Sequence, residues 1–214
     1  MQEHHLEVKR TARYFTLGTL NEQTKHIWFV LHGYGQLAQF FIKKFEVLHN
    51  DDTFIVAPEA LSRFYLQGVS GRVGASWMTK EERAYEIDDY IFYLNQLYDS
   101  LLHDRSLSDV QITILGFSQG NATVLRWLNA DHIRYDRLVI WAGFFANGVA
   151  DVIDPAKLTN IPTTLVYGTQ DEYLVQVDLA KYETDIKTAI PHLEVITFEG
   201  KHTIDSETLK KLER

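Results

Sequence analysis

Short apolar runs and segments of helical period alternate along most of the chain. Six runs of four to six residues are rich in β-branched and aromatic side chains, which is typical of strands buried on both faces of a sheet. These predicted strands are His26–Leu31, Thr53–Ala57, Val110–Leu115, Leu138–Trp141, Thr163–Tyr167 and Leu193–Phe198.

The segments between these runs have the spacing of amphipathic helices. Within Glu81–Leu102, apolar side chains recur at steps of three and four, which predicts one stripe facing the core. Gln36–His49 repeats the pattern, and Asn121–Asn129, Val177–Ile190 and Ile204–Leu212 are weaker helix predictions. The predicted core stripe of the first helix consists of Ala84, Ile87, Ile91, Leu94, Tyr98 and Leu101.

The alternation of strands and helices predicts an α/β fold, with a mostly parallel sheet covered by helices on both faces. Arg13–Leu17 is expected to add an early edge strand, for which antiparallel pairing is open. Pro58–Lys80 and Ala142–Pro162 read as long loops. Ligands of such sheets bind beyond the carboxyl ends of the strands, so both loops are expected to line one site. The length favours one domain spanning residues 1–214.

Composition and charge narrow the range of partners and compartments. The formal net charge is −8 and the isoelectric point is near 5.6. A basic surface for phosphates is therefore not expected, and neither is a nucleic-acid partner. The polar N-terminal residues contain no apolar stretch, so no integral membrane association is predicted. The absence of cysteine fits a reducing compartment, and the cytoplasm is the expected location.

The segment Gly116-Phe117-Ser118-Gln119-Gly120 has the pattern G-x-S-x-G between a predicted strand and a predicted helix. This context is typical of a catalytic serine held on a sharp strand-to-helix turn. Glycines two positions on either side relieve crowding around such a turn. Ser118 is therefore the predicted nucleophile, and the alternative is a serine that caps the following helix.

A serine hydroxyl needs an imidazole to take its proton, and a carboxylate to orient that imidazole. Downstream of the serine, Asp171 follows the run that ends at Tyr167, and His202 follows the last predicted strand. Both positions lie just after a strand, so the order serine, acid, histidine predicts a triad. Glu172 and Asp178 are competing acids near Asp171, while His192 precedes a strand and lies at the wrong end of the sheet.

A glycine-rich turn, Leu31-His32-Gly33-Tyr34-Gly35, closes the first long apolar strand. The natural donors to an oxyanion are the backbone N–H groups of Tyr34 and of Gln119, the residue after the serine. The alternative is an ordinary strand-to-helix turn. No pair of histidines has metal-ligand spacing on one helix face, so neither a metal nor another cofactor is predicted.

Four segments together resemble one known family. LHGYG, GFSQG, GTQD and GKHTI look like the phospholipase/carboxylesterase group of α/β-hydrolases, which contains small carboxylesterases and acyl-protein thioesterases. The resemblance covers the chain from about Lys25 to the C-terminus. It implies an α/β-hydrolase fold, the triad Ser118, Asp171 and His202, and an oxyanion hole at Tyr34 and Gln119. GASWM, with Trp77, resembles the family's S-W element in the loop that lines the acyl site.

Two positions depart from the family pattern. Asn121 stands where a second glycine usually follows GFSQG, and Lys201 stands where a glycine usually precedes the catalytic histidine. About 20 residues separate the predicted strands Leu138–Trp141 and Thr163–Tyr167, too few for a large cap domain. Recognition of an acyl or aromatic substrate is then expected from aromatic side chains of the surrounding loops. They are Tyr34, Phe64, Tyr65, Trp77, Phe144, Phe145 and Tyr173.

The sequence therefore predicts a serine hydrolase that cleaves the ester or thioester bond of a small-molecule or acyl substrate. Trp77, Phe64, Phe144 and Tyr173 are its predicted substrate-binding residues. One alternative is a peptidase or amidase with the same triad. The other is a non-catalytic ligand-binding protein on a hydrolase scaffold. The sequence leaves the oligomeric state open.

Overall fold

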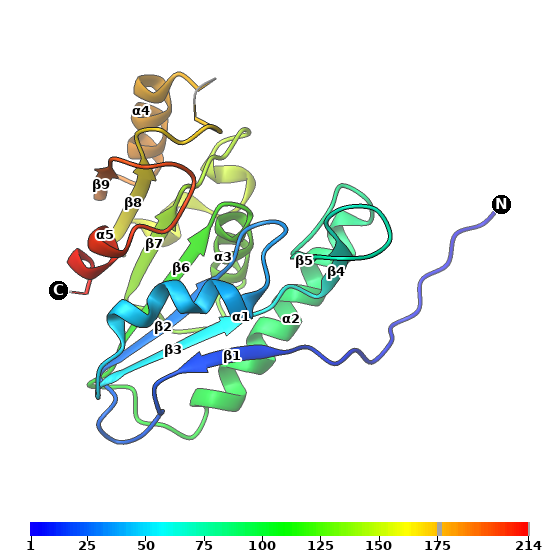
Figure 1. Cartoon of the computed structure of the whole chain (residues 1–214), viewed down its shortest axis with the longest axis horizontal. Coiled ribbons are helices and arrows are strands. Elements are labelled where there is room, and N and C mark those ends of the chain that lie inside the picture. Colours follow the sequence, from blue (N-terminus) through cyan, green and yellow to red (C-terminus); the bar gives the residue numbers. More distant parts are fainter. Residues whose placement is uncertain (175–176, 214) are drawn as a thin grey trace.

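The computed structural model describes residues 1–174 and 177–213, and a seven-stranded sheet forms its centre (Figure 1). The strand order is β1-β3-β2-β6-β7-β8-β9. All neighbouring pairs are parallel except β1 and β3, so the predicted mostly parallel sheet with an early edge strand is confirmed. The strands are β1 (Tyr14–Leu17), β2 (His26–Leu31), β3 (Thr53–Pro58), β6 (Gln111–Phe117), β7 (Arg137–Trp141), β8 (Thr163–Gly168) and β9 (Leu193–Phe198).

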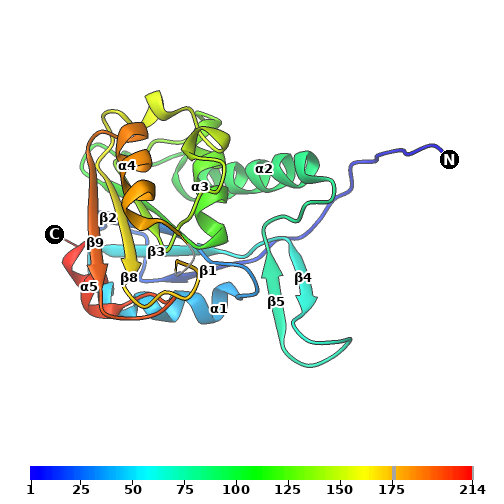
Figure 2. The same cartoon turned by 90° about the horizontal axis from the view of Figure 1, so that it is seen from above.

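Helices cover both faces of this sheet (Figure 2). One face carries α2 (Arg83–Leu102), α3 (Gln119–Asn129) and α4 (Leu179–Ala189). The other face carries α1 (Ala38–Phe41), the 3₁₀ segment η1 (Ile42–Leu48) and α5 (Ser206–Lys211). A strand between two such layers must be apolar on both sides, which is why the central strands read as continuous apolar runs.

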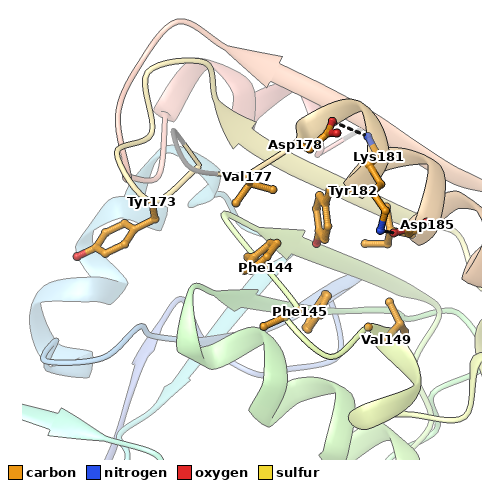
Figure 3. Close-up of a pocket in the computed structure, with 12 residues that line it drawn as sticks. Phe144, Phe145, Val149, Tyr173, Val177, Asp178, Lys181, Tyr182 and Asp185 are labelled. Carbon is orange, nitrogen blue, oxygen red and sulfur yellow. Dashed lines mark hydrogen bonds and ion pairs between the residues drawn. The ribbon is translucent and has the colours of Figure 1, made fainter.

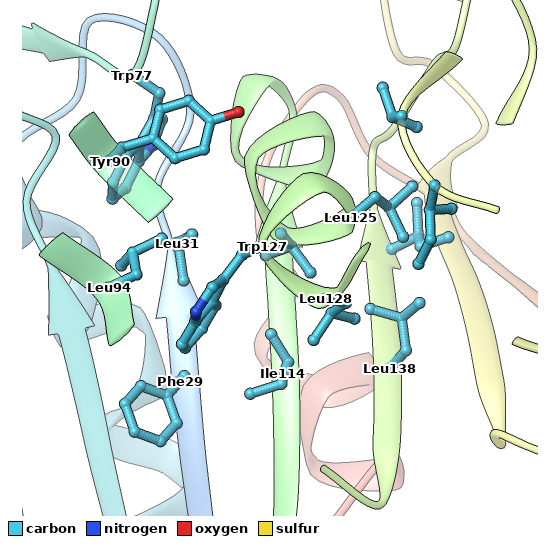
Figure 4. Close-up of a cluster of buried hydrophobic side chains, with 14 of the residues drawn as sticks. Phe29, Leu31, Trp77, Tyr90, Leu94, Ile114, Leu125, Trp127, Leu128 and Leu138 are labelled. Atoms are coloured by element: carbon cyan, nitrogen blue, oxygen red, sulfur yellow. The ribbon is translucent and has the colours of Figure 1, made fainter. Parts of the chain in front are cut away.

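The larger part of the core lies between the sheet and helices α2 and α3 (Figure 4). The Trp127 ring of α3 lies edge-on to Phe29 of β2, with 5.7 Å between ring centroids, and Tyr98 of α2 packs against both. Burying each side chain of this size contributes about 1.5–3 kcal/mol to folding. The core face of α2 differs from the predicted stripe: Ala84 is exposed, and the buried residues are Tyr90, Leu94, Leu97, Tyr98 and Leu102.

The predicted helix over Gln36–His49 has a different geometry from the expected one. Only Ala38–Phe41 is α-helical, and Ile42–Leu48 continues as a 3₁₀ helix. Within η1 the buried residues are Ile42, Phe45 and Leu48, spaced by three. A 3₁₀ helix has three residues per turn, so this spacing places all three side chains on one line against the sheet.

The segment Pro58–Lys80 is not a plain loop, as the sequence suggested, because it contains a hairpin of β4 (Ser62–Tyr65) and β5 (Val73–Ser76). The hairpin projects from the side of the sheet, and its base is bound to the turn after β2 (Figure 2). The Gly35 N–H donates to the Ala75 carbonyl at 2.9 Å. A Cβ on Gly74 would lie 2.4 Å from the Gly35 carbonyl oxygen, so only glycine permits this contact. Ala142–Pro162 holds two short 3₁₀ turns, η2 (Val149–Asp151) and η3 (Pro155–Leu158).

Candidate active site

Ser118 is the single residue between the end of β6 and the start of α3, and its backbone has a strained conformation. Its φ is 52° and its ψ is −118°, in a region that residues other than glycine rarely adopt. The flanking glycines make this turn possible. A Cβ on Gly120 would lie 2.4 Å from the Leu31 carbonyl oxygen, and one on Gly116 would lie 2.6 Å from the Asn121 Cα. The turn therefore raises Ser118 at the carboxyl end of the sheet.

The structure brings Asp171 and His202 together, although they follow different strands. The His202 Nδ1 lies 2.7 Å from Asp171 Oδ2, and the carboxylate is almost fully buried. The second oxygen, Oδ1, accepts the backbone N–H of Tyr173 at 3.0 Å. Because Nδ1 donates to the carboxylate, the neutral imidazole presents Nε2 as an acceptor on its opposite side.

Close backbone contacts hold these two turns against each other. The Thr169 N–H donates to the Phe198 carbonyl at 2.9 Å, and the Gln170 N–H donates to the Gly200 carbonyl at 2.9 Å. A Cβ on Gly168 would lie 2.3 Å from the Gly200 carbonyl oxygen. Gly200 therefore lies directly over the end of β8, and the two turns cannot separate without breaking these bonds.

The segment after β9 runs back across the ends of β8 and β7 (Figure 1). The Trp141 indole, at the end of β7, donates to the Thr203 carbonyl at 2.8 Å. The imidazole lies 4.9 Å from the ring of Phe117, the residue before Ser118, measured between centroids. Within the described residues, no hydrogen bond joins the Ser118 hydroxyl to His202.

The turn after β2 lies beside Ser118 and supplies free backbone donors. A Cβ on Gly33 would lie 3.1 Å from the Ser118 Cβ, so these two chain segments touch. In the part of the chain that the structure describes, the Tyr34 N–H has no backbone partner. Gln119 is the first residue of α3, and its N–H has no partner within the helix. Both predicted oxyanion donors are thus available near the serine turn.

The side chain of Gln119 fixes the start of α3 to the segment after β5. Its Oε1 accepts the Trp77 N–H at 3.1 Å, and its Nε2 donates to the Met78 carbonyl at 2.9 Å. The Gln36 Oε1 accepts the Gly33 N–H at 2.9 Å in the neighbouring turn. These side-chain bonds restrict the movement of the two segments that carry the backbone N–H groups of Tyr34 and Gln119.

His32 is a structural residue of the site that the sequence analysis did not single out. Its ring is fully buried; Nδ1 donates to the Gly33 carbonyl at 2.8 Å, and Nε2 accepts the Ala60 N–H at 3.1 Å. Burial lowers the pKa of His32 from 6.5 to about 4, so the ring is neutral near pH 7. The signal that could have identified His32 in the sequence is its position directly after an apolar run, at the end of a buried strand.

The predicted substrate-binding aromatics lie in different places. Trp77 is buried, and its indole donates to the His32 carbonyl at 2.8 Å, so it supports the turn from beneath. Phe64 packs against the exposed ring of Tyr34, with 5.2 Å between centroids. Phe144 and Tyr173 line a cavity of about 540 Å³ between α4 and the segment after β7 (Figure 3).

This cavity is next to the histidine. The Tyr173 ring lies 4.6 Å from the His202 ring, and Phe144 faces Tyr182 at 5.2 Å. The edge of the cavity is charged, because Lys181 lies there with Asp178 and is paired with Asp185 at 3.1 Å. The apolar side chains of the lining are Phe144, Phe145, Ala146, Val149, Tyr173, Val177, Tyr182 and Ile186.

Possible metal ligands are found away from this site. Among the described residues, one exposed group places ligand atoms within 4.8 Å of one another: Glu3, His5 and Glu82. The His5 Nε2 is already 3.0 Å from the Glu82 carboxylate. None of the helices in residues 1–174 and 177–213 has both the length and the apolar character of a membrane span.

Comparisons with known proteins agree with this fold. The model of the phospholipase/carboxylesterase family matches residues 19–214, and the chain therefore belongs to that family. Acyl-protein thioesterase 2 from Zea mays is a similar solved structure, with a TM-score of 0.69 at 17% identity over 95% of this chain and 96% of that one. A phospholipase/carboxylesterase from Dyadobacter fermentans has a TM-score of 0.65 at 16% identity over 97% of both chains.

A search of curated proteins finds no significant match to the sequence. The family match and the similar structures confirm the predicted α/β-hydrolase fold. The family match also places the chain among hydrolases of the phospholipase/carboxylesterase type.

Proposed function

We propose that this chain is one catalytic domain that hydrolyses carboxylic ester or thioester bonds through an acyl-enzyme on Ser118. The observation that carries the proposal is the 2.7 Å bond between His202 Nδ1 and the buried Asp171 carboxylate, at the same end of the sheet as the strained Ser118 turn. The family match supports the reaction class. The proposed chemistry needs no metal or other cofactor, because side chains and backbone groups supply every proton and every oxyanion contact.

In the proposed mechanism, His202 Nε2 takes the proton of Ser118 as the hydroxyl oxygen attacks the substrate carbonyl carbon. Asp171 holds the imidazole in the required tautomer and stabilises its positive charge. The N–H groups of Tyr34 and Gln119 bind the oxyanion of the tetrahedral intermediate. His202 then protonates the leaving alcohol or thiol, and the acyl group remains on Ser118.

The second half of the cycle uses the same groups. His202 takes a proton from water, the resulting hydroxide attacks the acyl carbon, and the carboxylic acid leaves as Ser118 regains its proton. Both halves require the imidazole to reach the serine oxygen and the water.

The cavity beside His202 supports an apolar substrate. Its apolar lining, with Tyr173 at the side of the histidine, fits an acyl chain or an aryl group. The similar maize structure is that of an acyl-protein thioesterase, which supports a thioester as one substrate class. A panel of p-nitrophenyl esters, acyl thioesters and aminoacyl amides separates esterase from peptidase activity.

The decisive experiment is covalent labelling with a fluorophosphonate. The probe should label Ser118, and Ser118→Ala should lose the label and lower kcat for p-nitrophenyl acetate by about 10⁴-fold or more. Ser108→Ala, which changes an exposed serine, is the matched control and should keep both properties. Turnover that survives Ser118→Ala at the parental rate would end the proposal.

A further inference from the structure

Asn121 occupies a position where the family pattern has glycine, and its side chain is buried next to the nucleophile turn. The amide nitrogen Nδ2 donates to the Ser118 carbonyl at 3.0 Å and to the Trp141 carbonyl at 2.9 Å. The amide oxygen accepts the Trp141 N–H at 3.2 Å. One side chain therefore binds the serine turn to the end of β7 and satisfies both of its own donors.

Two glycines leave the room that this amide fills. A Cβ on Gly143 would lie 2.8 Å from the Asn121 Nδ2, and a Cβ on Gly116 would lie 2.8 Å from its Oδ1. The site is built around the asparagine, because a side chain at either position would collide with the amide.

Trp141 continues the connection toward the histidine. Its indole Nε1 donates to the carbonyl of Thr203, the residue after His202, at 2.8 Å, and the ring is fully buried. The ring also packs against Phe198 at the end of β9, with 5.9 Å between centroids. Hydrogen bonds of these two residues thus connect Ser118, through Asn121 and Trp141, to the turn that carries His202.

We infer that Asn121 and Trp141 are positioning residues that set the distance between Ser118 and His202. The inference rests on the proposed function, since it concerns the geometry of that reaction. The two catalytic turns follow β6 and β9, which are separated by two intervening strands about 4.8 Å apart. A displacement of about 1 Å between reacting groups can cost about a hundredfold in rate. A fixed connection across the end of β7 prevents that displacement.

The chain offers a matched control for a purely structural role. Trp127 is also fully buried, and its indole donates to Asn95 Oδ1 at 2.8 Å, the same length as the Trp141 bond. That bond joins α3 to α2 and contacts neither catalytic turn. Trp127→Phe and Trp141→Phe therefore remove equivalent hydrogen bonds while each keeps an aromatic ring in place.

The test compares Asn121→Ala, Trp141→Phe and Trp127→Phe in the full chain by fluorophosphonate labelling rate, by kcat and KM for p-nitrophenyl acetate, and by Tm. All three variants should have a lower Tm. Asn121→Ala should lower kcat and the labelling rate by about a hundredfold, and Trp141→Phe by about tenfold, with KM within about threefold of the parent. Trp127→Phe should keep kcat within about twofold.

The fold-loss of activity in the double variant Asn121→Ala/Trp141→Phe should be smaller than the product of the two single fold-losses, because both substitutions break the same connection. Equal kcat values for Trp141→Phe and Trp127→Phe would overturn the inference, and this comparison decides the question even if Asn121→Ala does not fold. Absence of label on Ser118 in the parent protein would instead refute the proposed function.

Discussion

His32 makes the stability of this protein depend on pH below neutrality. The fully buried ring is held in its neutral form, with Nδ1 donating to the Gly33 carbonyl and Nε2 accepting the Ala60 N–H. Protonation would turn Nε2 into a donor that faces another donor. Burial lowers the pKa of His32 from 6.5 to about 4, against smaller opposing contributions from Gly33 and from the Glu59 charge.

The magnitude follows from the two pKa values. The unfolded chain binds the proton near pH 6.5, and the folded chain binds it only near pH 4, a difference of about 2.5 units. Each unit corresponds to about 1.4 kcal/mol, so the free energy of unfolding should fall by about 3 kcal/mol as the pH drops from 6.5 to 4. Below pH 4 this histidine adds no further loss. Since domains are stable by only about 5–15 kcal/mol, the effect is large.

Urea unfolding followed by tryptophan fluorescence at pH 7, 6, 5 and 4 measures this loss. Carboxylates also contribute to the slope, so the informative quantity is the difference between the parent and His32→Gln. The variant should be less stable at pH 7 but should lose about 3 kcal/mol less over the same range. His49→Gln changes an exposed histidine and should keep the parental slope. Equal slopes in the parent and His32→Gln would refute the reasoning.

Two further substitutions test the catalytic acid and the serine turn. Asp171→Asn should lower kcat by about a thousandfold, because it removes the carboxylate that bonds His202 Nδ1 at 2.7 Å. An ion pair near a protein surface is worth about 4 kcal/mol, which corresponds to about a thousandfold in rate. Turnover of p-nitrophenyl acetate measures the loss, and an unchanged rate would contradict the prediction. Gly120→Ala should lower the free energy of unfolding by about 3 kcal/mol, because its Cβ would meet the Leu31 carbonyl. Gly68→Ala, with φ of 59° but open space around it, should cost only about 1 kcal/mol, and equal losses in urea would show that the contact does not matter.

The strands were the most predictable part of the fold. A strand between two helix layers needs apolar side chains on both faces, so a short stretch of sequence is enough to reveal it. The run His26–Leu31 is an example, and its predicted ends match those of β2. The hairpin in Pro58–Lys80 was missed for the opposite reason. Its strands alternate weakly and contain glycine at Gly74, and its base depends on contacts with Gly35 from a distant turn.

Helix geometry was less predictable than helix position. A spacing of three and four residues is compatible with two helix types, and only contact with the sheet selects the 3₁₀ form at Ile42–Leu48. The orientation of α2 also depends on its neighbours, because Tyr90 is buried against the Trp77 ring of a distant segment, while Ala84 faces solvent.

By itself the sequence determined the order of the strands of the central sheet and the positions of the helices between them. It also identified Ser118, Asp171 and His202 as candidates, because turn chemistry and strand ends leave local signatures. Only the tertiary structure decided that Asp171 and His202 bond to each other, and that Asn121 and Trp141 link their end of the sheet to the serine turn. The physical reason is that these bonds join residues far apart in the chain. Their distances depend on how all seven strands pair, which no short segment encodes.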